Sequence, residues 1–165
     1  MALTGNTMLA NGPSTMLIDS IKSEVEKVRL KDLLYVVFCF DKCGTQLVVK
    51  EAKENPSRND KLALKKEEVL RERFATFKTL IRSLGGCYAI FDFETGAECG
   101  TPRSIFFLVI VVPDDLDVRT RFLYSSNAQK IADQVGIAVK QVQINQHDDL
   151  TYDYLKQMCL SLKKG

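Results

Sequence analysis

The stretch IFFLVIVV, at residues 105–112, is apolar at every position and decides the fold of this chain. A strand without a polar side has to be buried on both sides, so it lies inside a sheet whose two faces are covered. The run LLYVVFCF, at 33–40, has the same character and is rich in β-branched and aromatic residues. The sequence therefore predicts a layered domain with at least two central strands.

Shorter extended segments complete the predicted sheet. A turn at 41–44, DKCG, joins the strand at 33–40 to an extended segment at 46–49, which indicates a hairpin. Further strands are expected at 88–93 and 139–144. The polar segment 50–61 contains Pro56 and lacks apolar periodicity, so we expect a solvated loop there.

Four segments carry apolar residues at the three- and four-residue spacing of an amphipathic helix. They cover 14–28, 62–84, a stretch from Asp115 or Asp117 to about 135, and 149–162. Gly85-Gly86 and Gly136 are natural stops for the second and third of these helices. The buried stripe of the third helix is predicted to consist of Tyr124, Ala128, Ile131 and Val135.

The order of these elements is helix, hairpin, helix, two strands, helix, strand and helix. This order predicts an α/β chain of the α+β type, with a central mixed five-stranded sheet flanked by helices on both faces. A chain of 165 residues is long enough for one domain with its own core. We therefore expect a single domain over 1–165, with a flexible N-terminal segment at 1–13.

The bulk composition argues against several classes of protein. Twenty-three basic residues against 21 acidic ones give a formal net charge of +2, which is too balanced for a protein that coats nucleic acid by bulk charge. No stretch reaches the about 18 apolar residues of a membrane span, and no secretion signal precedes the first helix. We expect a cytoplasmic protein that does not insert into membranes.

The chain has five cysteines: Cys39, Cys43, Cys87, Cys99 and Cys159. Their odd number, without paired close spacing, suits reduced thiols better than a disulfide framework. Cys39 and Cys43 lie four residues apart, but His147 is the one histidine, so a zinc site is not expected. We expect no metal and no cofactor.

Arg119, Arg121 and Phe122 stand together at the start of the third predicted helix. Cations in the first turns oppose the helix dipole at a cost of roughly a few tenths of a kcal/mol, so stability alone does not select them. Guanidinium groups bind carboxylates in a bidentate manner, and Phe122 lies off the Tyr124 stripe, as an apolar interface anchor would. The alternative is a solvated arginine pair with Phe122 completing the core.

Five strings, in order along the chain, resemble the actin-depolymerising factor/cofilin family. They are FATF at 74–77, CYAIFD at 87–92, IFFL at 105–108 with Pro113-Asp114, VRTRFLYSS at 118–126, and VQ at 142–143 with DLTYD at 149–153. The string at 118–126 is the most specific, since it resembles the start of the family's long actin-binding helix. The resemblance covers nearly the whole chain and implies a single ADF-homology domain.

The family resemblance implies a non-enzymatic protein that binds actin monomers and filaments and promotes filament depolymerisation, severing and turnover. The actin contacts that it implies are Arg119, Arg121, Phe122, Ser126, Asn127, Thr4 and Gly5, with the long helix inserted between two actin subdomains. Contacts specific to filaments are implied at Arg103, Asp148 and Asp149. Thr4 is the candidate for a phosphorylation that weakens actin binding by adding roughly −1.5 to −2 charges.

The sequence departs from the family pattern in its basic residues. In the second half of the long helix only Lys130 is basic, so phosphoinositide binding is doubtful. Arg103 matches only one of the family's basic residues before the central strand. The basic run implied for nuclear import in some members is thinned to Lys27, Arg29 and Lys31. Monomer binding is therefore better supported than filament severing.

Three other functions are considered as alternatives. An enzyme finds little support, because His147 has no recognisable nucleophile motif near it in sequence and no phosphate-binding loop is present. A regulator of the glia maturation factor type, which binds the branched-filament nucleating complex, has the same fold but lacks the paired basic residues that Arg119 and Arg121 provide here. Sequestration of actin monomers without severing is also open, and we expect the protein itself to be a monomer.

Overall fold

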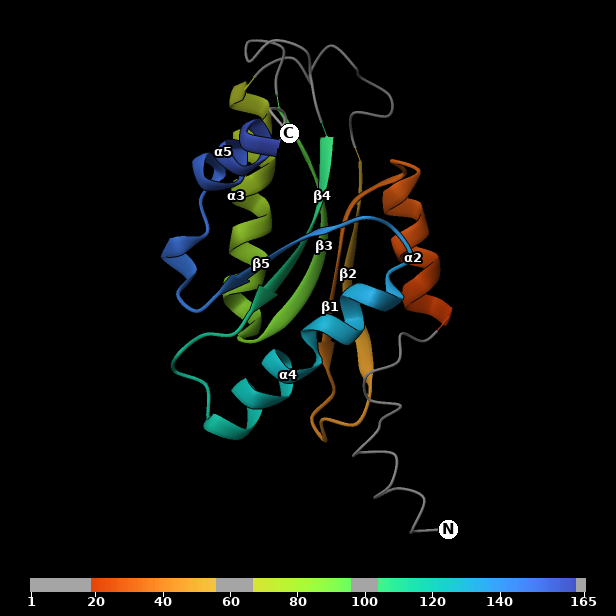
Figure 1. The fold of residues 1–165 in the computed structure, drawn as a ribbon, viewed down its shortest axis with the longest axis vertical. Helices are drawn as coiled ribbons and strands as arrows, with labels where there is room; N and C mark the ends of the chain where they lie inside the picture. Colours follow the sequence, from red (N-terminus) through yellow and green to blue (C-terminus); the bar gives the residue numbers. More distant parts are fainter. Residues whose placement is uncertain (1–18, 56–66, 96–103, 163–165) are drawn as a thin grey trace.

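The computed structural model describes residues 19–55, 67–95 and 104–162 (Figure 1). The elements in chain order are α2 (Asp19–Arg29), β1 (Leu33–Phe40), β2 (Leu47–Glu54), α3 (Glu67–Leu84), β3 (Cys87–Glu94), β4 (Ser104–Val111), α4 (Val118–Gln134), β5 (Lys140–Ile144), a 3-10 turn (His147–Asp149) and α5 (Tyr152–Leu162). No helix within these residues is long and apolar enough to cross a membrane.

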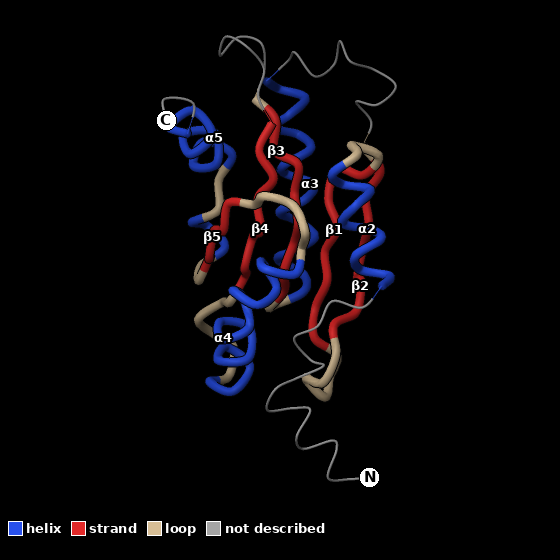
Figure 2. Tube along the Cα trace, turned by 45° about the vertical axis from the view of Figure 1, so that its right-hand side comes forward, coloured by secondary structure: helices blue, strands red, loops and turns tan. Residues whose placement is uncertain are grey.

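The strands form one mixed five-stranded sheet in the order β2-β1-β3-β4-β5 (Figure 2). Neighbouring strands from β2 to β4 are antiparallel, whereas β4 and β5 are parallel. The strand at the centre, β3, is buried along almost its whole length, and β1 is buried throughout. The predicted mixed five-stranded sheet is confirmed. The two apolar runs, which form β1 and β4, both lie in the interior of the sheet, as predicted.

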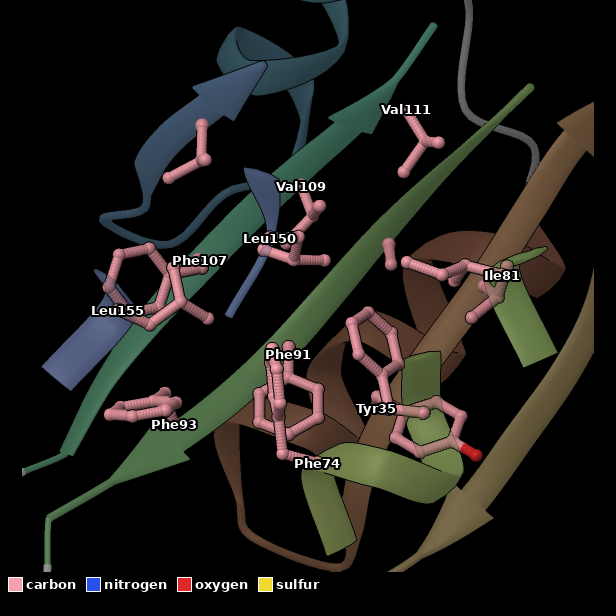
Figure 3. Close-up of a cluster of buried hydrophobic side chains, with 14 of the residues drawn as sticks. Tyr35, Phe74, Ile81, Phe91, Phe93, Phe107, Val109, Val111, Leu150 and Leu155 are labelled. Carbon is pink, nitrogen blue, oxygen red and sulfur yellow. The ribbon is translucent and has the colours of Figure 1, made fainter. Parts of the chain in front are cut away.

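Helices cover both faces of the sheet, as expected. On one face, α3 and α5 pack with Leu70, Phe74, Phe77 and Ile81 of α3 and with Leu155 of α5. Figure 3 shows this core, with the rings of Tyr35, Phe74 and Phe91 labelled. The Phe77 ring, from the same core, lies 4.6 Å from the Phe91 ring and 5.1 Å from the Tyr35 ring. On the other face, α2 and α4 enclose a second core that includes Ile21, Val25 and Val28 of α2.

The prediction of a loop at 50–61 was wrong for its first part, because β2 continues to Glu54. The reason is that β2 is an edge strand whose residues from Val49 to Glu54 are exposed, so no apolar alternation marks them as extended. Residues 56–61 lie outside the described part of the chain.

The last helix begins later than expected. Residues 147–149 form a 3-10 turn, and α5 starts at Tyr152 rather than at Asp149. The Thr151 hydroxyl accepts a hydrogen bond from the Tyr154 N–H at 3.1 Å, which caps the first turn of α5. The first parts of the two helices predicted at 14–28 and 62–84 fall outside the described residues, which begin at Asp19 in α2 and at Glu67 in α3.

Candidate partner-binding surface

The start of α4 is fixed by its own N-cap. Of the two aspartates that the sequence offered, Asp117 is the cap: its carboxylate accepts from the Thr120 N–H at 3.1 Å and from the Thr120 hydroxyl at 2.6 Å. These hydrogen bonds lower the pKa of the Asp117 carboxyl. The helix therefore begins abruptly at Val118, and its first turn is held in one orientation.

The inner side of α4 is anchored to the sheet by Tyr124. Its hydroxyl accepts a hydrogen bond from the Phe40 N–H at 3.0 Å, and its carbonyl accepts one from the Tyr88 hydroxyl at 2.6 Å. The predicted stripe of Tyr124, Ala128, Ile131 and Val135 is buried, which confirms it. Gly86 lies under the Tyr124 ring, where a Cβ would come within 2.9 Å of that ring, so a side chain there would displace the helix.

The outer side of the same turn is apolar and exposed. Val118 is 71% exposed and Phe122 is 70% exposed, the highest fractions among the large apolar side chains that the structure describes. They stand four residues apart and thus on one side of the helix, with the exposed Arg119 beside them. The alternative in which Phe122 completes the core is therefore excluded. Sequence reasoning gave no role to Val118, although its four-residue spacing from Phe122 was a usable signal.

Arg121 does not share this surface fully. Two residues are roughly 200° around a helix with 3.6 residues per turn, so Arg121 lies on nearly the opposite side of α4 from Arg119. Its side chain is half-buried, and its Nε donates to the Leu116 carbonyl at 3.0 Å. Arg121 thus supports the turn that leads into α4, whereas Arg119 and Phe122 point outward. The expectation of two equivalent arginines is corrected in this respect.

Ser126 and Asn127, the two polar residues implied by the family resemblance, differ in their exposure on the next turn of α4. Ser126 is exposed on the side of Phe122, one turn further along. Asn127 is only 8% exposed, and its side-chain amide donates to the Leu123 carbonyl at 2.9 Å. Ser126 is therefore accessible to a partner, whereas the Asn127 amide serves the helix itself.

A cleft of about 400 Å³ lies beside the exposed face of α4. It is lined by the turn between β1 and β2 and by α4, with Lys42 and Cys43 on one side and Arg119 and Thr120 on the other. Gly44 allows this approach, because its φ of +71° disfavours a side chain and a Cβ would come within 3.1 Å of Leu123. The sequence did not indicate that Lys42 and Arg119 line the same cleft, since only the fold brings the two segments to it.

The other predicted site residues lie elsewhere. Asp148 and Asp149 are exposed on the 3-10 turn, and Asp148 pairs with Arg82 of α3 at 2.7 Å. His147 is half-buried rather than exposed, and burial lowers its pKa. Thr4, Gly5 and Arg103 are outside the described residues. Within the described ranges, no group of three histidine, cysteine, aspartate or glutamate side chains is placed to hold a metal ion.

Comparison with known proteins gives this surface its context. The model of the family described as cofilin/tropomyosin-type actin-binding proteins matches residues 15–160. The chain belongs to this cofilin family. The family and its fold are those of actin-binding proteins without enzymatic activity, and the family is cytoplasmic and associated with actin.

A curated relative is actin-depolymerizing factor 4 of Oryza sativa subsp. japonica. It is 24% identical over 153 residues, which are 90% of this cofilin-family chain and 97% of the rice protein. The match therefore spans the relative almost completely.

Solved structures of several branches share the fold. Actin depolymerization factor 2 of Plasmodium berghei has a TM-score of 0.70 at 14% identity, covering 88% of this chain and 96% of that one. The ADF-like UNC-60A protein of Caenorhabditis elegans has a TM-score of 0.67 at 18% identity, covering 88% and 93%. Glia maturation factor of the same organism has a TM-score of 0.60 at 13% identity, covering 86% and 93%. The TM-scores establish the cofilin fold, and the low identities do not separate its branches.

Proposed function

We propose that this cofilin-family protein binds actin through the outer face of α4 and promotes the depolymerisation and turnover of actin filaments in the cytoplasm. The observation that carries the proposal is the exposed pair of Val118 and Phe122 beside Arg119, in a family of actin-binding proteins. Arg119, Phe122 and Ser126 form the centre of the proposed contact, and Val118 extends it.

The chemistry of this face suits a grooved protein surface. Two apolar side chains at a spacing of four residues are the anchors of a helix that lies in a groove. Burying Phe122 against a partner removes apolar surface from water, and large side chains of this kind carry much of the binding energy of an interface. Arg119 beside them can form a charge-assisted pair with a carboxylate at the rim of the groove.

The remaining residues of the proposal have supporting roles. Arg121 holds the turn at Leu116 and still has guanidinium donors that can reach a partner. Thr4 and Gly5 are proposed to contribute at the N-terminus, with Thr4 as a site of inhibitory phosphorylation. Arg103 and Asp149 are proposed filament contacts. Asp148 can contact a filament only if its ion pair with Arg82 is broken. Asn127 is not included in the proposed contact, because its side-chain amide donates to the Leu123 carbonyl.

The function is tested by mixing the purified protein with actin filaments, followed by sedimentation and fluorescence microscopy. We expect actin to move from the pellet to the supernatant and the filaments to shorten. A rise in soluble actin without fragments would indicate depolymerisation or monomer sequestration without severing. If the protein neither sediments with filaments nor changes the amount of soluble actin, the proposed function is wrong.

A further inference from the structure

The cleft between the β1–β2 turn and α4 is lined by two cations that the described part of the chain does not neutralise. Lys42 belongs to the turn and Arg119 to α4, and both are exposed. Among the described residues neither forms an ion pair, whereas Arg71, Arg82 and Lys156 each pair with a carboxylate. The cleft therefore attracts negative charge from outside the chain.

Asp41 is the one carboxylate lining the cleft within the described residues, and the turn itself uses its oxygens. Its side chain accepts hydrogen bonds from the Thr45 N–H at 2.9 Å and from the Thr45 hydroxyl at 3.2 Å. These hydrogen bonds, chiefly the one from the Thr45 N–H, lower the pKa of the Asp41 carboxyl. Two backbone hydrogen bonds of 2.9 Å, from the Gly44 N–H to the Asp41 carbonyl and from the Asp41 N–H to the Gln46 carbonyl, close the turn. The turn thus presents Lys42 on a well-defined backbone.

Arg119 connects this cleft with the exposed apolar face of α4. Helical geometry places Phe122 roughly 60° from Arg119 in one direction and Leu123 roughly 40° from it in the other. Leu123 lines the cleft, whereas Phe122 stands outside it and is exposed. A partner that buries Phe122 therefore has to pass only Arg119 to reach the cleft.

We propose that the cleft is a second arm of the actin contact and takes up an acidic segment of actin, whose carboxylates pair with Lys42 and Arg119. This inference rests on the proposed function and extends the contact from α4 to the β1–β2 turn. Arginine binds a carboxylate in a bidentate manner and lysine acts as a point charge, so both suit an acidic segment. Charge pairs of this kind fix the orientation of a partner and speed its association.

The thiol of Cys43 reports directly on whether the cleft is covered. Cys43 lines the cleft and is exposed, whereas the other three cysteines that the structure describes are buried. The full chain is alkylated with iodoacetamide, and mass spectrometry follows the peptide that contains Cys43, with and without saturating actin monomers. We expect bound actin to slow the alkylation of Cys43 several-fold.

A charge reversal tests the role of Lys42 in binding. Lys42→Glu puts a like charge against the acidic segment, so its dissociation constant for actin monomers should rise about tenfold or more at low salt. The matched control is Lys53→Glu, which makes the same change of charge on an exposed residue near the far end of β2 and should bind like the parent. High salt should narrow the difference between the two variants, because it screens exposed charges, whereas a disturbed fold would persist.

The outcomes separate this inference from the proposed function. If the parent protein does not bind actin monomers, both are wrong. If Phe122→Ala weakens binding but Lys42→Glu binds like Lys53→Glu, the proposed function stands and the second arm is overturned. Alkylation of Cys43 at an unchanged rate in the actin complex also overturns it. So does protection of Cys43 by sodium phosphate but not by actin, because the cleft would then be a site for small anions.

Discussion

Replacing Phe122 with alanine is expected to weaken the binding of actin monomers about thirtyfold, which corresponds to about 2 kcal/mol. The ring is 70% exposed in the free protein, so its removal leaves the fold untouched but deletes the central apolar anchor of the proposed contact. Affinity for fluorescently labelled actin monomers, measured by titration, gives the change directly. Combining Phe122→Ala with Arg119→Ala should lower the affinity further, since the latter removes the neighbouring charge.

Two control variants make the result specific. Leu30→Ala truncates another large exposed apolar side chain, 51% exposed at the end of α2, and should leave monomer binding within about twofold of the parent. Arg121→Ala should weaken binding less than Arg119→Ala does, because Arg121 faces the Leu116 carbonyl. If Phe122→Ala and Leu30→Ala bind equally well, the outer face of α4 is not the actin contact.

Phe77→Ala is expected to lower the free energy of unfolding by about 3–5 kcal/mol, the range for truncating a buried aromatic ring. Phe77 is fully buried between α3 and the sheet, and its ring lies close to the rings of Tyr35, Phe74 and Phe91. Urea denaturation followed by circular dichroism measures the loss, which is a large fraction of the stability of a typical domain.

The matched control for this core substitution is Thr76→Ala, one residue away on the exposed side of α3. Its hydroxyl only donates back to the Glu72 carbonyl, so the free energy of unfolding should change by less than about 0.5 kcal/mol. A loss below about 1 kcal/mol for Phe77→Ala would show that the ring is not packed as described.

Much of the fold was predictable because burial leaves a periodic trace in sequence. The continuous apolar runs at 33–40 and 105–112 predicted interior strands, and the spacing of Tyr124, Ala128 and Ile131 predicted the inner side of α4. Where an element has no buried side, its sequence shows no apolar periodicity. The second half of β2 therefore read as a loop: its residues are held by backbone pairing with β1 and have no buried side to mark them.

The candidate site was predictable to the level of the helical turn. The first turn of α4 carries Arg119 and Phe122 outward, in agreement with the sequence-based hypothesis. The sequence could not predict that Arg119 is exposed while Arg121 donates to the Leu116 carbonyl. This difference depends on the position of that carbonyl and on the start of the helix that the Asp117 cap sets. That Lys42 and Arg119 line one cleft also depends on tertiary contacts that no local pattern encodes.

The most direct test of the proposed function is a side-by-side binding measurement with pure actin monomers and with the pure branched-filament nucleating complex. The full chain is expected to bind the monomers, and Phe122→Ala is expected to lose most of that binding. Binding to the nucleating complex without measurable binding to actin would contradict the proposal and would assign this cofilin-fold protein to the glia maturation factor type instead.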